Sequence, residues 1–163
     1  MSDSSLDINS KLAALGIVVQ QQVPQPTANY CMAVKSGNHL HLCGHNPQRN
    51  DDARTLIRGK LGKNLSIDEG YQAARLCAIQ LLYTIHHELQ GDWSKLVRIV
   101  KLVGFVNCTP DFEHHPAVIN GASDLLVDIF GPQRGMHARS AVGMQSLPFG
   151  IATEVECIVE VQD

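Results

Sequence analysis

Lysine and arginine are scarce in this sequence: they make up 13 of its 163 residues, against 16 aspartates and glutamates, and the net charge is −3. They form no basic cluster, and a nucleic-acid-binding surface needs one, so we expect no nucleic acid as a partner. Apolar runs of membrane-spanning length are also missing, and the N-terminus MSDSSLD lacks the basic-then-apolar layout of a secretion signal. These absences predict a cytoplasmic protein that does not associate with a membrane.

A complete metal-ligand pattern is missing as well. The five cysteines are odd in number and include no C-x-x-C pair, which indicates reduced thiols in core or interface positions. His39 and His41 share one face of a predicted strand and His45 follows, which leaves a metal site as an alternative. No carboxylate or cysteine at a suitable spacing completes a known ligand set, so we favour strand and pocket-rim positions for these histidines.

The length and an ordinary composition, 44% apolar and 18% charged, indicate one globular domain over residues 1–163. Residues 1–23 form an N-terminal extension with a short helix from Asp7 to Leu15, which Gly16 ends. The apolar side of this helix consists of Ile8, Leu12 and Leu15.

Strand and turn patterns follow the extension. A hairpin is predicted from Tyr30 to Lys35 and from His39 to Cys43, joined through Ser36-Gly37-Asn38. Short strands are expected at 17–19 and 56–61.

Two helices follow with helical apolar spacing. The first begins after Ser66, whose spacing from Glu69 is that of a capping box, and runs to about Leu89. The second runs from about Pro116 to Phe130 and ends at Gly131-Pro132.

Between these helices, residues 96–106 form a strand that is apolar on both sides. One side carries Val100, Leu102 and Val106, which would be exposed to solvent in a sheet covered by only a few helices. We therefore expect a partner subunit to cover them.

The C-terminal residues combine a core-facing strand with charges. From Ile151 the odd positions are largely apolar, while Glu154, Glu156 and Glu160 occupy even positions, which predicts a strand with one buried face. Upstream, Arg139 opens a second apolar run. If the two runs are neighbours in a sheet, Arg139 and Glu154 can lie close together, either as a solvated salt bridge or as a site for a small carboxylic acid and a water.

The pattern R-S-A-V-x(4)-L-P-x(5)-E-V-E, from Arg139 to Glu156, resembles the C-terminal signature of the Rid family of enamine/imine deaminases, also called YjgF or endoribonuclease L-PSP proteins. Further matching segments are Pro26-x(3)-Tyr30, Ser36-Gly37-Asn38, Cys43-Gly44-His45-Asn46-Pro47 and Val106-x(4)-Asp111-Phe112. The resemblance implies the chorismate-mutase-like α+β fold, a mixed β-sheet with two helices packed on one face. It also implies a homotrimer whose subunits bury the other face.

The resemblance implies a site in the cleft between neighbouring subunits. Arg139 matches the arginine that holds the substrate carboxylate, and Glu154 matches the glutamate that orients or activates the attacking water. Tyr30 matches the tyrosine that closes the pocket, and Gly44 stands where a backbone group lies near the substrate nitrogen. Asn120 matches an asparagine of the second helix.

Two substrate-binding positions depart from the family pattern. Ala141 stands where many members carry a cysteine, which removes thiol chemistry but keeps the backbone atoms. His45 replaces the usual glutamine, and near the pocket mouth it either donates to the substrate or forms pocket wall. Residues 113–116 are an insertion relative to the family.

The implied reaction is hydrolysis of reactive 2-imino or enamine acids derived from amino acids, giving a 2-keto acid and ammonia. It requires no metal and no organic cofactor. An alternative is a non-catalytic regulatory protein that binds a small carboxylate in the same cleft. A weaker alternative is the ribonuclease of the family's old name, which the absence of a basic stripe disfavours.

Overall fold

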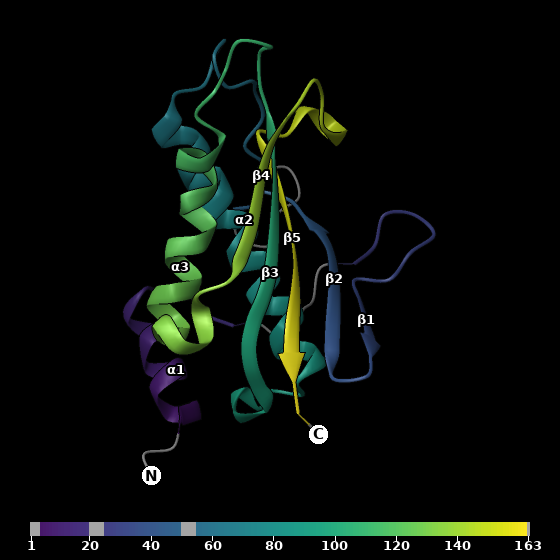
Figure 1. Ribbon diagram of the computed structural model, residues 1–163, viewed down its shortest axis with the longest axis vertical. Helices are drawn as coiled ribbons and strands as arrows, with labels where there is room; N and C mark the ends of the chain where they lie inside the picture. The colour runs from purple at the N-terminus through teal and green to yellow at the C-terminus, as the bar shows by residue number, and fades with distance from the viewer. Residues whose placement is uncertain (1–3, 20–24, 50–54, 163) are drawn as a thin grey trace.

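A five-stranded mixed sheet forms the centre of the fold in the computed structural model, which describes residues 4–19, 25–49 and 55–162 (Figure 1). Its strands are β1 (Ala33–Ser36), β2 (His39–His45), β3 (Leu96–Asn107), β4 (Ala138–Met144) and β5 (Thr153–Val161). Their spatial order is β1-β2-β5-β3-β4. Strands β3 and β4 are parallel and the other neighbouring pairs are antiparallel.

The helices α2 (Ile67–Glu88) and α3 (His115–Gly135) lie together on one face of this sheet (Figure 1). The helix α1 (Ser4–Ala14) packs against α3 and against the short 3-10 helix η2 (Trp93–Lys95). This arrangement confirms the predicted α+β, chorismate-mutase-like fold.

Two helix boundaries predicted from the sequence can be compared with the structure, the start of α2 and the end of α3. The Glu69 N–H donates to Ser66 Oγ at 3.2 Å, and the Ser66 N–H donates to Glu69 Oε2 at 2.8 Å, so the capping box is confirmed. Gly131, with a φ of 73°, interrupts α3, and a further turn continues to Gly135. The predicted end at Gly131-Pro132 is therefore a kink.

Three local predictions are wrong, one about the end of a helix and two about short strands. Leu15 lies beyond the end of α1 and is 40% exposed, whereas Ile8 and Leu12 are buried as expected. Residues 17–19 form no strand. Residues 56–61 also form no strand, because they make only isolated bridges to several different partners as they cross the ends of the sheet.

The β3 side chains that face the helices are not the ones predicted, because the pairing of β3 with β5 contains two irregularities. The one between Ile99 and Lys101 reverses the order of faces, so Ile99, Leu102 and Val106 all face the helices and are fully buried. The expectation that Leu102 and Val106 require a partner subunit for cover is therefore wrong.

The sheet face opposite α2 and α3 has a mixed character. It carries Val103 and Phe105 of β3, both half-buried, and Val142 of β4, which is 40% exposed. The even positions of β5, including Glu154 and Glu156, lie on the same face, while the odd positions are buried under the helices as predicted. We call this surface the open face.

No helix within the described residues is both long enough and apolar enough to cross a membrane.

Candidate functional site

Arg139 lies on the edge strand β4 and points toward the helices. It pairs with the fully buried Leu102 in the parallel ladder, so both side chains are on the helix side. Its guanidinium donates to Asn120 Oδ1 at 2.8 Å, to Ser123 Oγ at 3.0 Å and to the Pro116 carbonyl at 3.4 Å. These acceptors are neutral, so they orient the guanidinium without cancelling its charge, and a carboxylate suits such a fixed cation.

The sequence did not single out Ser123, which is held by a second residue. Its Oγ lies 3.0 Å from His137 Nε2, and His137 Nδ1 lies 2.7 Å from the Gly135 carbonyl oxygen. A carbonyl only accepts, so Nδ1 donates and the neutral ring accepts the Ser123 hydroxyl proton at Nε2. Burial lowers the pKa of His137, which favours this neutral form. The position three residues after Asn120, on the same helix face, is the signal that identifies Ser123.

Ala141 follows Arg139 on the same side of β4, and it is half-buried against the core. Gly143 comes next on that side. A Cβ at Gly143 would lie 2.8 Å from Cys108 Sγ and would overlap with His115 at the start of α3. The small residues therefore allow α3 to approach β4 closely beside Arg139.

Glu154 lies on β5 and occupies the open face. It pairs with Phe105, while its neighbours Thr153 and Val155 are fully buried on the helix side. Burial raises the pKa of the Glu154 carboxyl above its usual range, and the nearby Glu156 carboxylate raises it further. Such a carboxyl can accept and return a proton closer to neutral pH than an ordinary glutamate.

The Glu154 carboxyl lies directly against the backbone of Gly44, which has no side chain. A Cβ at Gly44 would lie 2.6 Å from Glu154 Cδ, far inside van der Waals contact. Only glycine therefore fits at this position while Glu154 keeps its place. The predicted site residues Gly44 and Glu154 are neighbours in the structure.

A β-bulge in β2 produces this contact. The pairing with β5 advances by three residues on β2, from Leu42 to His45, but by only two on β5. Cys43 and Gly44 consequently share the space opposite one residue, and Gly44 is turned toward the open face.

The same bulge places His45 on the helix side of the sheet rather than at the mouth of a pocket. His45 is 2% exposed and faces α2. Its Nδ1 lies 2.8 Å from the Cys43 carbonyl oxygen, and its Nε2 lies 2.7 Å from Thr84 Oγ1. Burial lowers the pKa of His45 to about 4, so the ring is neutral at pH 7. The expectation that His45 contacts substrate is therefore wrong for this chain.

The histidines considered as metal ligands do not converge. His39 and His41 pair with even positions of β5 on the open face, with ring centroids 6.4 Å apart, whereas His45 lies on the opposite side. Across residues 4–19, 25–49 and 55–162, no cluster of three histidine, cysteine or acidic side chains is arranged to hold a metal ion.

Arg139 and Glu154 do not meet within one chain. Strand β3 lies between β4 and β5, and the two side chains point to opposite faces of the sheet. The expectation of a close pair assumed that the two runs were neighbours. The predicted residues instead form two groups, which are Arg139 with Asn120 and Ala141 beside α3, and Glu154 with Gly44 on the open face.

Tyr30 precedes the hairpin, because β1 begins only at Ala33. It is 46% exposed, and its hydroxyl oxygen accepts a hydrogen bond from the Thr27 N–H at 3.4 Å. Its side chain is therefore accessible to a ligand or a partner chain.

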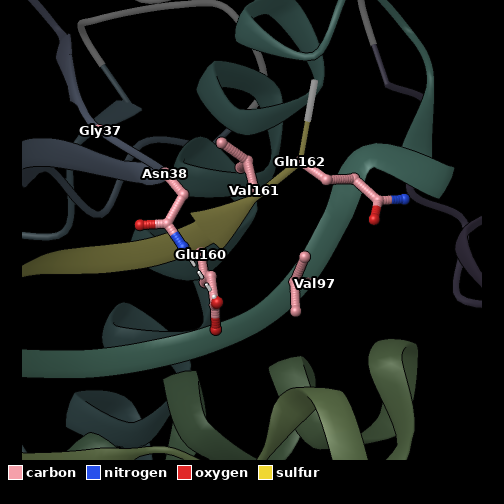
Figure 2. A pocket seen from close by; sticks show the side chains of 6 residues that line it. All are labelled: Gly37, Asn38, Val97, Glu160, Val161 and Gln162. Atoms are coloured by element: carbon pink, nitrogen blue, oxygen red, sulfur yellow. Dashed lines mark hydrogen bonds between the residues drawn. The ribbon is translucent and has the colours of Figure 1, made fainter.

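A pocket of about 340 Å³ lies at the other end of β5 (Figure 2). It is lined by Gly37, Asn38, Val97, Glu160, Val161 and Gln162. The Asn38 side-chain amide donates to Glu160 Oε1 at 3.1 Å. Glu160 is six positions from Glu154 along β5, about 20 Å at strand spacing, so this pocket is distinct from the group that contains Glu154 and Gly44.

The buried neutral His45 predicts a loss of stability in acid. The unfolded chain takes up a proton near pH 6.5, whereas folded His45 does so only near pH 4, so folding becomes less favourable as pH falls between these values. We expect His45 to lower the free energy of unfolding by about 2 kcal/mol at pH 5 relative to pH 7. Urea titrations at both pH values measure this, and a His45→Gln chain that shows the same difference would contradict it.

Comparison with known proteins gives matches over nearly the whole chain. Residues 9–160 match the family model described as "YjgF/chorismate_mutase-like, putative endoribonuclease". Protein TCP17 of Trypanosoma cruzi is 41% identical over 96% of this chain and 95% of its own length. A 2-iminobutanoate/2-iminopropanoate deaminase of Dermatophagoides farinae is 28% identical over 90% of this chain and 96% of its own.

Among solved structures, the protein Atu1372 of Agrobacterium tumefaciens, described as having unknown function, is 38% identical and has a TM-score of 0.85. The similarity covers 98% of this chain and 96% of that one. The described fold is therefore shared over nearly the full length of both chains.

Proposed function

Because the chain belongs to the YjgF/chorismate mutase-like family, we propose that it hydrolyses reactive 2-imino acids and their enamine tautomers to 2-keto acids and ammonia. The name of the Dermatophagoides farinae relative supports this reaction class. The proposal rests above all on one observation, the half-buried Glu154 carboxyl with its raised pKa, held against the bare backbone of Gly44.

Arg139 is the proposed carboxylate-binding residue. Asn120 and Ser123 hold the guanidinium in place through its donors, and a substrate carboxylate would replace solvent on its remaining donors. Binding of this kind fixes the imine carbon relative to the protein, so that the reaction with water becomes effectively intramolecular.

Glu154 is the proposed acid–base residue. Its carboxylate accepts a proton from water as the oxygen attacks the protonated imine carbon and the C=N π electrons move to nitrogen. The resulting carbinolamine loses its amine when Glu154 returns the proton to nitrogen and the C–N bond breaks. The carbinol O–H proton then leaves to solvent or ammonia, which gives the keto acid and ammonium.

We further propose that each site lies between two subunits of a homotrimer. Arg139 and Glu154 occupy opposite faces of one sheet, so a single chain cannot present both to one small molecule. A neighbouring subunit that covers the open face would bring its own Arg139 edge toward Glu154. The mixed apolar and charged residues of the open face are consistent with such a contact.

Turnover of 2-iminobutanoate and 2-iminopropanoate tests the proposal. The imines are generated in situ by an amino-acid oxidase, and semicarbazide trapping measures their loss. We expect Arg139→Ala to lower kcat/KM about 100-fold, because paired charge-assisted hydrogen bonds contribute about 3 kcal/mol. Arg75→Ala removes an arginine of α2 instead and is the matched control.

One result would overturn the proposal, and a binding measurement on the same chain would then decide what replaces it. Imine loss at the uncatalysed rate with the native chain rules out this reaction for these substrates. If the same chain still binds 2-ketobutyrate through Arg139, the regulatory carboxylate-binding alternative replaces it.

A further inference from the structure

The bulge of β2 is built around a glycine, the residue whose backbone is least restrained. Gly44 has no side chain that could lock its peptide groups, and glycine populates more backbone conformations than any other residue. Yet the close approach of the Glu154 carboxyl depends on where the Gly44 backbone lies. Something other than Gly44 must therefore fix this segment.

The imidazole of His45 supplies such a restraint. Its Nδ1 donates to the Cys43 carbonyl oxygen at 2.8 Å, because that oxygen can only accept. The bond closes a ring that contains both peptide groups of Gly44. Its geometry therefore limits the φ and ψ of Gly44 directly.

The other ring nitrogen ties the bulge to the helical layer. His45 Nε2 lies 2.7 Å from Thr84 Oγ1, and the Gln80 carbonyl is a weaker acceptor for the same hydroxyl at 3.4 Å. In the neutral ring Nε2 accepts the Thr84 proton. Thr84 is fully buried in α2, whose inward face is buried from Gly70 to Ile85, so the hydroxyl is held by the packing of the helix.

We propose that His45 and Thr84 are positioning residues, which hold the β2 bulge so that the Gly44 backbone and the Glu154 carboxyl keep the relative placement that the reaction needs. This inference rests on the proposed function. Neither residue touches the substrate, since both are buried on the helix side of the sheet. Their effect passes through Gly44 to the open face.

The test compares variants that keep or remove the hydroxyl bonded to His45. Thr84→Val keeps the shape of the side chain and removes the hydroxyl, while Thr84→Ser keeps the hydroxyl. Ile85→Val trims a neighbouring fully buried side chain of α2 and controls for lost packing. The full-length proteins are compared by kcat, KM and the pH profile of kcat in the imine assay.

We expect Thr84→Val to lower kcat about tenfold with KM within about twofold, because a misplaced reacting group affects the transition state more than binding. The acidic limb of the pH profile of kcat in Thr84→Val should also move to lower pH, because the Glu154 carboxyl becomes more solvated and its pKa falls. Thr84→Ser should restore native values, and Ile85→Val should change melting temperature without changing kcat. Equal kcat in Thr84→Val and the native chain, or an equal loss in Ile85→Val, overturns the inference.

A second measurement does not depend on turnover. NMR follows the titration of the ¹³C-labelled Glu154 carboxyl and the amide shift of Gly44 in the same variants. If the native chain hydrolyses no imine, the proposed function fails, but a changed Glu154 midpoint in Thr84→Val and not in Thr84→Ser still supports the positioning role. An unchanged midpoint in Thr84→Val overturns it.

Discussion

Mixing two inactive variants should restore imine hydrolysis. Arg139→Ala chains retain Glu154, and Glu154→Gln chains retain Arg139. If each site takes its arginine from one subunit and its glutamate from the next, random assembly of equal amounts gives intact sites at about a quarter of positions. The two variants are co-refolded from denaturant, and the specific activity of the mixture is compared with that of each variant refolded alone.

This result depends on the opposite placement of the two side chains on the sheet. An active site contained in one chain would give no recovery, since every chain in the mixture lacks one of the two groups. Activity that stays at the level of the separate variants, while light scattering shows mixed oligomers, would exclude the intersubunit site.

Glu154→Gln alone should lower kcat by about 10²- to 10⁴-fold, the range usual for loss of a general acid–base group. The amide has nearly the same shape as the carboxyl but cannot take a proton from water. Binding of 2-ketobutyrate should remain within about threefold of the native value, because Arg139 is unchanged. Stopped-flow imine decay and calorimetric titration measure the two quantities.

Glu156→Gln is the matched control, because it removes the next carboxylate on the same face of β5. It should leave kcat near the native value. Since the Glu156 charge contributes to the raised pKa of Glu154, the acidic limb of the pH profile should move slightly to lower pH. A comparable loss of kcat in both variants would remove the special role of Glu154.

The elements whose pattern is local could be predicted from the sequence. The alternation from Thr153 to Val161 depends only on which side of a strand each residue occupies, and the capping box of Ser66 and Glu69 involves four consecutive positions. The order of strands could not be read in this way. The insertion of β3 between β4 and β5 depends on long-range pairing, and it is what separates Arg139 from Glu154 in one chain.

The bulges account for two further wrong assignments, those of His45 and of Leu102 with Val106. A period-2 reading from Leu40 and Leu42 puts His45 on the open face, and the extra residue in β2 turns it inward. The irregularity after Ile99 has the same effect on Leu102 and Val106. A glycine inside a strand pattern, such as Gly44, can mark a bulge, but the pairing that defines the added residue is seen only against the partner strand. Asn120 and Arg139, by contrast, were predicted as site residues and are hydrogen-bonded.

The central position of β5 has a consequence for folding. This strand follows the other four in the sequence, yet it lies between β2 and β3 and pairs with both. Until β5 docks, the hairpin and the β3–α3–β4 unit remain two fragments with unpaired inner strands. Any state in which β5 is not docked therefore exposes two strand edges that can pair with another chain.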